Sequence, residues 1–395
     1  MTQRPKTARS RAARPTLEGL EARALLSDMS TAPAEVSAVQ AHPTSQSILQ
    51  NLTPLLTATT VAANGDNNPY GVAFIPKDFP AGGKLKPGDI LVSDFNNGMS
   101  GEQATGVSIV SIDPQGNTTT FYTGPPGLGL NTALGVLPGG FIIVGNTPRT
   151  TVNGTPTVEP GSLLILDRNG QVVETLSASD PVNKLDGPWG LTIVNQGSTS
   201  HVFVSNVLNG TVTRIDMSTR HGKPPKFMGA VEVASGYAFA TNPAALVVGP
   251  QGLAFDARRH VLYVASTADN AIFTVLHPLE ATSSKGTGTV FAQNDGHLNG
   301  PLSLALAPNG HLLVTNGDAI LPNAPPPPFN LILEYQPPRG RATTGTFVAQ
   351  QQIDMGAAGA AFGLAIGSTS DHNQILAAVD DNSNSLIEWT IKKTK

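Results

Sequence analysis

The sequence predicts an all-β protein, specifically a six-bladed β-propeller built from four-stranded antiparallel blades. Two features of the 395 residues support an all-β class: 41 glycines and 32 prolines supply many turns, and charged residues make up only 13%. A third feature, a short phrase that recurs six times along the chain, indicates repeated structural units. Repeats of this kind share one continuous architecture, so they outweigh the several domains that length alone would suggest.

Each repeat opens with a turn-and-strand phrase such as Pro188-Trp189-Gly190-Leu191. A second apolar strand follows and ends on a polar residue, as in Val202–Asn206, and then come a third strand and a more polar fourth strand. Near-continuous apolar runs are typical of strands covered on both faces, and four strands repeated radially form propeller blades. In this phrase an aromatic or apolar residue, such as Trp189, is followed by the residue on which the repeats are aligned. The six aligned residues are Gly71, Gly135, Gly190, Gly252, Ser303 and Gly363.

The last repeat lacks a fourth strand, because the chain ends soon after Trp389-Thr390-Ile391. The apolar and threonine-rich segment at residues 55–62 precedes the first repeat and has no other assignment. We expect it to supply the missing strand, which closes the ring without a free edge. Residues 53–395 are therefore predicted to form a single propeller.

Residues 1–27 carry six basic residues against two acidic ones and are predicted to be a leader, while residues 28–52 are predicted to be a flexible linker. Leu20-Glu21, Arg23 and Leu25-Leu26 resemble the LEPR-XLL motif of large extracytoplasmic proteins in planctomycete-type bacteria, with Ala22 where that motif has proline. The resemblance implies export to the cell surface or periplasm.

The repeats resemble NHL-type propellers over about residues 53–391, through Pro-x-Gly-[Leu/Val]-Ala-Phe, the polar strand ends and the turn at Ala268–Ile272. This resemblance implies the fold but carries over no activity. The regucalcin and gluconolactonase propellers hold a catalytic divalent ion partly through a glutamate near the first blade. This chain has Asn68-Pro69 at that place, so that ligand does not transfer.

In a propeller, the loops that enter the first strands and those that follow the second strands share one face, which we call the mouth. The residues predicted to ring it are Tyr70, Leu134, Trp189, Gln251, Leu302 and Phe362, beside Asp94, Asn146, Asn206, Thr267, Asn316 and Asp380. We predict that Tyr70, Trp189 and Phe362 stack on a ligand. Asn146, Asn206 and Asn316 would orient that ligand, or else cap turns in each blade.

A metal site is the alternative for the mouth. Asp94, Asp380 and Asp381 fall on the neighbouring first and sixth blades, and carboxylate oxygens suit Ca²⁺ or Mg²⁺. The same residues could instead be solvated turn acids. His201, His260 and His311 precede second strands on the opposite face and are expected to be exposed hairpin residues. His297 is the one histidine on the mouth side to test as a base.

Sequence motifs narrow the function classes. No Gly-x-Ser-x-Gly elbow, His-Glu-x-x-His helix or Walker phosphate loop occurs, and the net charge of −4 gives no basic stripe for nucleic acid. There is no cysteine and no apolar run long enough for a transmembrane helix. The leading hypothesis is a non-catalytic extracytoplasmic scaffold that binds a protein, glycan or small molecule at the mouth. The alternatives are a divalent-metal-dependent hydrolase or lyase, resembling lactonase or streptogramin-lyase propellers, and a rigid spacer in a surface protein.

Overall fold

The computed structural model describes residues 46–392, except residues 101, 130–131, 221–222, 244, 320–327, 341 and 369–372. The predicted leader and residues 28–45 of the predicted linker lie outside the described residues. Residues 45–395 form one compact unit. Within the described part of the chain, no helix has the length and apolar character needed to cross a bilayer.

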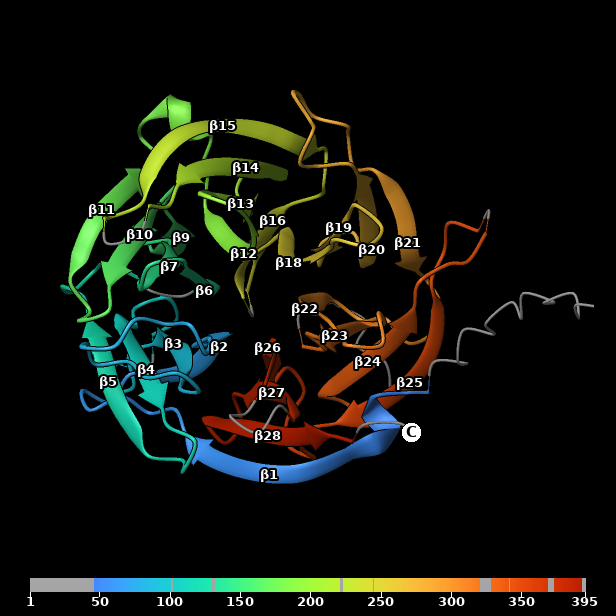
Figure 1. The fold of residues 1–395 in the computed structure, drawn as a ribbon, viewed down its shortest axis with the longest axis horizontal. Helices are drawn as coiled ribbons and strands as arrows, with labels where there is room; N and C mark the ends of the chain where they lie inside the picture. Colours follow the sequence, from blue (N-terminus) through green and yellow to red (C-terminus); the bar gives the residue numbers. More distant parts are fainter. Residues whose placement is uncertain are drawn as a thin grey trace, which may run out of the picture. The chain divides into compact units, whose positions relative to one another are not determined.

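The fold is a β-propeller of six four-stranded antiparallel blades, as the sequence predicts (Figure 1). Blade 1 contains β2 (Asn67–Phe74), β3 (Ile90–Asn96), β4 (Ser108–Ile112) and β5 (Thr118–Thr123). Blade 2 contains β6 (Leu134–Leu137), β7 (Phe141–Asn146), β10 (Ser162–Asp167) and β11 (Val172–Ser177). Blade 3 contains β12 (Pro188–Gln196), β13 (Thr199–Asn206), β14 (Thr211–Ser218) and β15 (Lys226–Ser235).

The remaining blades follow the same order from the axis outward. Blade 4 contains β18 (Pro250–Asp256), β19 (Val261–Ser266), β20 (Ala271–Leu276) and β21 (Thr289–Gln293). Blade 5 contains β22 (Pro301–Leu306), β23 (Leu312–Asn316), β24 (Leu331–Gln336) and β25 (Thr346–Gln352). Blade 6 contains β26 (Ala361–Ser368), β27 (Gln374–Asp380), β28 (Ser385–Ile391) and, as its outer strand, β1 (Leu52–Thr59).

The N-terminal closure is confirmed. β1 pairs antiparallel with β28 from Leu52↔Ile391 to Thr59↔Ser385, and Figure 1 shows the blue strand lying along the red one. Just before β1, a 3-10 turn (η1, Leu49–Asn51) packs Leu49 into the core shared by blades 5 and 6. Residues 46–51, at the end of the range predicted as linker, are thus part of the packed structure.

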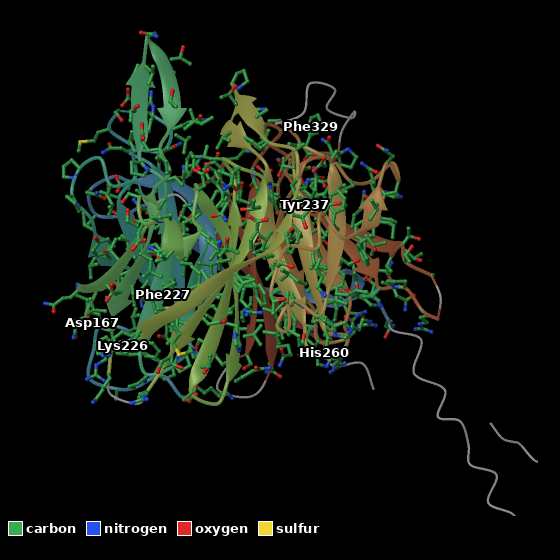
Figure 2. All side chains as sticks on the ribbon, turned by 90° about the horizontal axis from the view of Figure 1, so that it is seen from above. Asp167, Lys226, Phe227, Tyr237, His260 and Phe329 are labelled. Carbon is green, nitrogen blue, oxygen red and sulfur yellow. The ribbon has the colours of Figure 1, made fainter. Side chains whose placement is uncertain are left out.

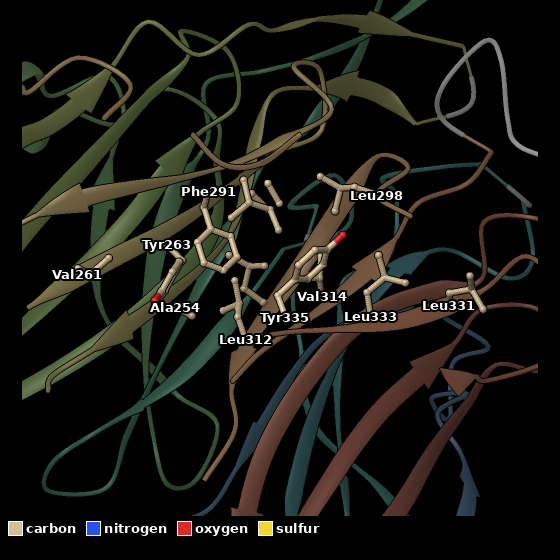
Figure 3. Packing of buried hydrophobic residues seen from close by; sticks show 14 residues of the cluster. Ala254, Val261, Tyr263, Phe291, Leu298, Leu312, Val314, Leu331, Leu333 and Tyr335 are labelled. Carbon is tan, nitrogen blue, oxygen red and sulfur yellow. The ribbon is translucent and has the colours of Figure 1, made fainter. Parts of the chain in front are cut away.

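Apolar side chains between neighbouring blades form the core. Figure 3 shows the layer between blades 4 and 5, where Tyr263, Phe291 and Tyr335 pack edge to face. All six residues of β19 are buried, as expected for a strand covered on both sides.

The recurring glycine of the first strand is required by the neighbouring blade. A Cβ at Gly190 would lie 1.9 Å from the carbonyl oxygen of Gln251 in blade 4, and one at Gly363 would lie 2.1 Å from that of Tyr70 in blade 1. Blade 2 corrects the sequence alignment: Leu134 pairs with Val144 just as Leu191 pairs with Val204, so Ala133 rather than Gly135 occupies this position. Leu134 therefore corresponds to Leu191, and both residues line the channel below the mouth.

Two hairpins extend the mouth face. One, β8 (Arg149–Val152) with β9 (Thr155–Val158), lies in the connection between β7 and β10 of blade 2 and projects from the upper side in Figure 2. The other, β16 (Ala240–Asn242) with β17 (Leu246–Val248), precedes blade 4, and β9 contacts β17. In blade 5, residues 317–329 of the connection between β23 and β24 lie mostly outside the described residues.

Candidate functional site

The mouth of the channel holds a cavity of about 190 Å³. Five of the six residues predicted to ring the mouth line this cavity; Leu134 does not, for the register reason given above. The lining residues are Asn68, Tyr70, Phe95, Gln103, Trp189, Ala245, Gln251, Leu302, Ala319, Ala358, Gly359, Phe362 and Asp381.

Three predicted aromatic residues meet in this cavity, although they are contributed by blades 1, 3 and 6. The Tyr70 ring lies 6.0 Å from the Trp189 ring in an edge-on arrangement and 5.4 Å from the Phe362 ring, between ring centroids. Phe95, at the end of β3, stacks on Tyr70 at 5.9 Å. Aromatic pairs at these separations stabilise beyond their buried area by about 0.5–1.5 kcal/mol each. The cluster is therefore a pre-formed aromatic wall.

A hydrogen-bond relay joins three blades beneath this wall. Trp189 Nε1 donates to Tyr70 Oη at 2.6 Å, and Tyr70 Oη donates to Gln251 Oε1 at 2.7 Å. Burial raises the pKa of Tyr70 well above its usual range, so this hydroxyl stays protonated and can donate. The relay fixes the aromatic rings and separates the mouth cavity from the channel below.

Deeper in the channel most of the lining side chains are apolar. A small space of about 70 Å³ lies below the relay, and a wider one of about 460 Å³ lies along the far ends of the first strands. Thr192 and Asn195 are the only polar side chains that line the wider space among the described residues. Neither space is lined by a carboxylate or histidine side chain, so the titratable chemistry of the described channel is confined to the mouth.

Asp381 is the single carboxylate that lines the mouth cavity among the described residues. Burial, and to a lesser extent the neighbouring Asp380 carboxylate, raises the pKa of Asp381 to about 6. Asp381 is therefore charged at neutral pH and can accept a hydrogen bond from a ligand or pair with a cation. Aromatic walls beside one carboxylate suit an aromatic or apolar group that carries a positive charge or a donor.

The three predicted asparagines lie at equivalent strand ends but do not line the cavity. Asn206 accepts from the Asp186 amide at 3.0 Å and donates to Thr213 Oγ1 at 3.0 Å, and Asn316 accepts from the Asn299 amide at 3.0 Å. Asn146 donates to the Leu128 carbonyl and accepts from Ser162 Oγ. All three are buried and bind the loop that enters their own blade, which is the turn-capping role weighed above.

The structure does not bring together the three predicted metal ligands. Asp380 is held in its turn by the Asn382 amide and the Ser383 hydroxyl. Asp94 is fully buried, and both of its carboxylate oxygens lack a partner among the described residues. Burial, with a contribution from the Asp66 carboxylate, raises the pKa of Asp94 well above its usual range, so the buried position disfavours the charged form of this side chain. Asp381 alone of the three reaches the cavity.

The histidine predictions need two corrections, at His311 and His201. His311 is buried, not exposed, because Glu334 lies directly beside it and its Nδ1 is 2.6 Å from Glu334 Oε1. His201 is mostly buried and contacts Asp216, whereas His260 is exposed as expected. His297 stacks flat on Phe347 with ring centroids 3.6 Å apart and does not line the mouth cavity.

Sequence reasoning missed Phe95, Asn68 and Gln103 as lining residues. Phe95 could have been found, since it directly follows Asp94 at a strand end predicted to reach the mouth. Gln103 lies in an irregular segment of the β3–β4 connection, and no periodic pattern indicates its position. The cavity is thus formed by the predicted repeat positions together with loops that no repeat specifies.

Comparisons with known proteins find similar solved structures at low sequence identity. No family model matches the chain, and no curated protein matches it. Solved structures that are similar include a streptogramin B lyase (15% identity, 88% of this chain and 100% of that one, TM-score 0.47). Others are a luciferin-regenerating enzyme (10%, 86% and 96%, TM-score 0.49) and the calcium-binding protein regucalcin from Agrobacterium tumefaciens (12%, 86% and 96%, TM-score 0.44).

Proposed function

We propose that this propeller is an extracytoplasmic binding scaffold, and that its mouth cavity takes one ring-sized apolar group carrying a positive charge or hydrogen-bond donor. The observation that carries the proposal is the aromatic wall of Tyr70, Trp189 and Phe362 facing Asp381. Such a group can belong to a small molecule or be the exposed part of a protein or glycan.

The size of the cavity supports recognition of a part rather than a whole ligand. Pockets for drug-sized molecules usually enclose about 300–1,000 Å³, whereas about 150 Å³ accommodates benzene. A space of about 190 Å³ therefore fits one ring. The rest of the ligand would lie on the rim, where connecting segments expose Met99, Val152, Phe239 and Met355. Exposed methionine and aromatic side chains are adaptable contact surfaces.

A titration with simple probes tests this proposal. Trp389→Phe leaves Trp189 as the sole tryptophan, so its fluorescence reports the cavity directly. We expect 2-phenylethylammonium to bind more tightly than 3-phenylpropanoate, and the preference to grow as pH rises through about 6, where Asp381 ionises. Asp381→Asn should abolish the preference and its pH dependence, and Phe362→Ala should weaken both ligands. Equal binding of both probes to wild type and Asp381→Asn would contradict the proposal.

The metal-dependent hydrolase or lyase is the second candidate, and it is supported by Asp381, the one carboxylate that lines the cavity among the residues described. Elemental analysis and melting with and without EDTA, compared between wild type and Asp381→Asn, separate the two. A divalent ion lost in Asp381→Asn, with a lowered melting temperature in EDTA for the wild type alone, would favour the enzyme. Export is tested by fractionating cells that produce the full chain or a variant with Arg23, Leu25 and Leu26 replaced.

A further inference from the structure

We propose that His260, His277 and Glu280 form a binding site for a Zn²⁺-class transition metal on the face opposite the mouth. One ligand atom from each residue lies within 4.8 Å of the other two. No other group of three or more histidine, aspartate or glutamate side chains meets this condition among the residues that the structure describes. Figure 2 places His260 on the lower side, away from Phe329 on the mouth side.

The residue types fit a borderline divalent metal. Two imidazoles and one carboxylate are a ligand set that Zn²⁺ uses with a fourth position left open, whereas Ca²⁺ and Mg²⁺ prefer oxygen ligands alone. At Zn–ligand distances of about 2.0–2.1 Å, tetrahedral ligands lie roughly 3.4 Å apart. The three ligand atoms lie at most 4.8 Å apart, so small side-chain rotations bring them to this spacing.

The backbone holds the two histidines in place. His260 lies in the turn between β18 and β19, and His277 directly follows β20; both have left-handed backbone, with φ of 53° and 51°. The His277 amide donates to the His260 carbonyl at 2.8 Å, and the two rings lie 5.9 Å apart between centroids. Left-handed conformations are uncommon for residues other than glycine. The hydrogen bond between the two backbones sets the spacing of the two histidine side chains.

A buried arginine holds the segment that carries Glu280. Arg214 donates to the carbonyls of Pro278 at 3.0 Å and Ala281 at 3.1 Å, and it is itself paired with Asp216 at 2.9 Å. Because these carbonyls flank Glu280, Arg214 fixes the conformation of the loop. The three ligand side chains remain exposed to solvent. Support of this kind is what orients ligands in a metal site.

The test is isothermal titration of the full chain, stripped with EDTA and dialysed, with ZnCl₂ and separately with CaCl₂. We expect one Zn²⁺ site per chain that is lost, or weakened at least about tenfold, in His260→Ala, His277→Ala and Glu280→Gln. Circular dichroism checks that each variant is folded.

His297→Ala is the matched control, since this histidine stacks on Phe347 outside the cluster. It should bind Zn²⁺ as wild type does. The proposal is overturned if no Zn²⁺ binds, if Ca²⁺ binds the same site equally well, or if all three cluster variants keep wild-type stoichiometry and affinity. Since Asp381→Asn leaves this site intact, failure here is distinct from failure of the mouth proposal.

Discussion

Replacing Glu334 by glutamine should loosen the attachment of the N-terminal segment to blade 5. This carboxylate is completely buried and accepts hydrogen bonds from Ser47 Oγ at 2.6 Å, the Ile48 amide at 2.9 Å and the Leu49 amide at 3.1 Å. The His311 ring contacts it as well. Glutamine has the same shape, but it replaces one acceptor oxygen by an amide donor that would face other donors.

The expected cost is about 2–4 kcal/mol in the free energy of unfolding, because buried donors lose a charged acceptor. For a unit spanning residues 45–395, an unfolding entropy of about 2.1 cal/mol/K per residue gives roughly 0.7 kcal/mol/K. The melting temperature should therefore fall by about 3–5 °C. Chemical denaturation and calorimetry measure both quantities, and hydrogen exchange should show the loss at η1 and β1 first.

The dependence on pH sharpens the test. Burial alone would raise the pKa of Glu334, but the hydrogen bonds from His311, Ser47 and the two amides outweigh it and lower the pKa. A carboxylate with a lowered folded-state pKa stabilises above its unfolded pKa, and this stability is lost as pH falls through the folded pKa. The difference between wild type and Glu334→Gln should thus be full at pH 6–8 and shrink in acid.

Two controls decide the interpretation. Glu174→Gln, on the exposed outer strand of blade 2, should change stability by less than about 0.5 kcal/mol. Ser47→Ala should cost about 1–2 kcal/mol, and combining it with Glu334→Gln should cost less than the sum. A Glu334→Gln protein as stable as wild type at pH 7, or strict additivity of the pair, would refute the reasoning.

Three further changes have defined outcomes. Gly363→Ala should destabilise by about 1–3 kcal/mol in denaturation experiments, because its Cβ would lie 2.1 Å from the Tyr70 carbonyl; Gly229→Ala, with no atom within 4 Å, should not. Burial raises the pKa of Glu388 from 4.5, its ordinary value, to about 7. The protonated Glu388 therefore contributes stability that is full below pH 4.5 and is lost as the pH rises through 7. Glu388→Gln should therefore be more stable than wild type by roughly 3 kcal/mol at pH 9 and equal to it at pH 4. Tyr70→Phe leaves Trp189 Nε1 and Gln251 without their partner and should cost about 1–3 kcal/mol, with altered Trp189 fluorescence in the Trp389→Phe background.

The six blades and the closing strand could be predicted because apolar strands, polar strand ends and turns recur with every unit. The exact register could not be predicted where a repeat departs from the others: in blade 2, Ala133 replaces the expected glycine, and Gly135 two residues later misled the alignment. His311 was predicted to be exposed because its partner Glu334 lies 23 residues away, and no local pattern reports such a pairing.

Part of the mouth cavity was also accessible to sequence reasoning, since five of its thirteen lining residues hold one repeat position. Lining residues in the connecting loops, such as Gln103, were not accessible, because no periodic pattern indicates where these loops lie. The cluster of His260, His277 and Glu280 was missed for a related reason. His277 and Glu280 lie after β20, whereas His260 lies before β19, so the spacing along the sequence resembles no known metal motif. Only the arrangement of β18 to β20 in blade 4 brings the three residues together.

The pairing of Leu52 with Ile391 has a consequence for how the protein is made. The partners are 339 positions apart (391 minus 52), so at about 5–20 residues per second β1 waits roughly 20–70 s on the ribosome before β28 exists. During synthesis β1 is an unsatisfied strand beside growing blades, a situation that invites mispairing. One residue of β1 counters this, because Pro54 has no backbone N–H to donate to a neighbouring strand. β28 therefore completes the ring, and a chain truncated before β28 would leave the ring open.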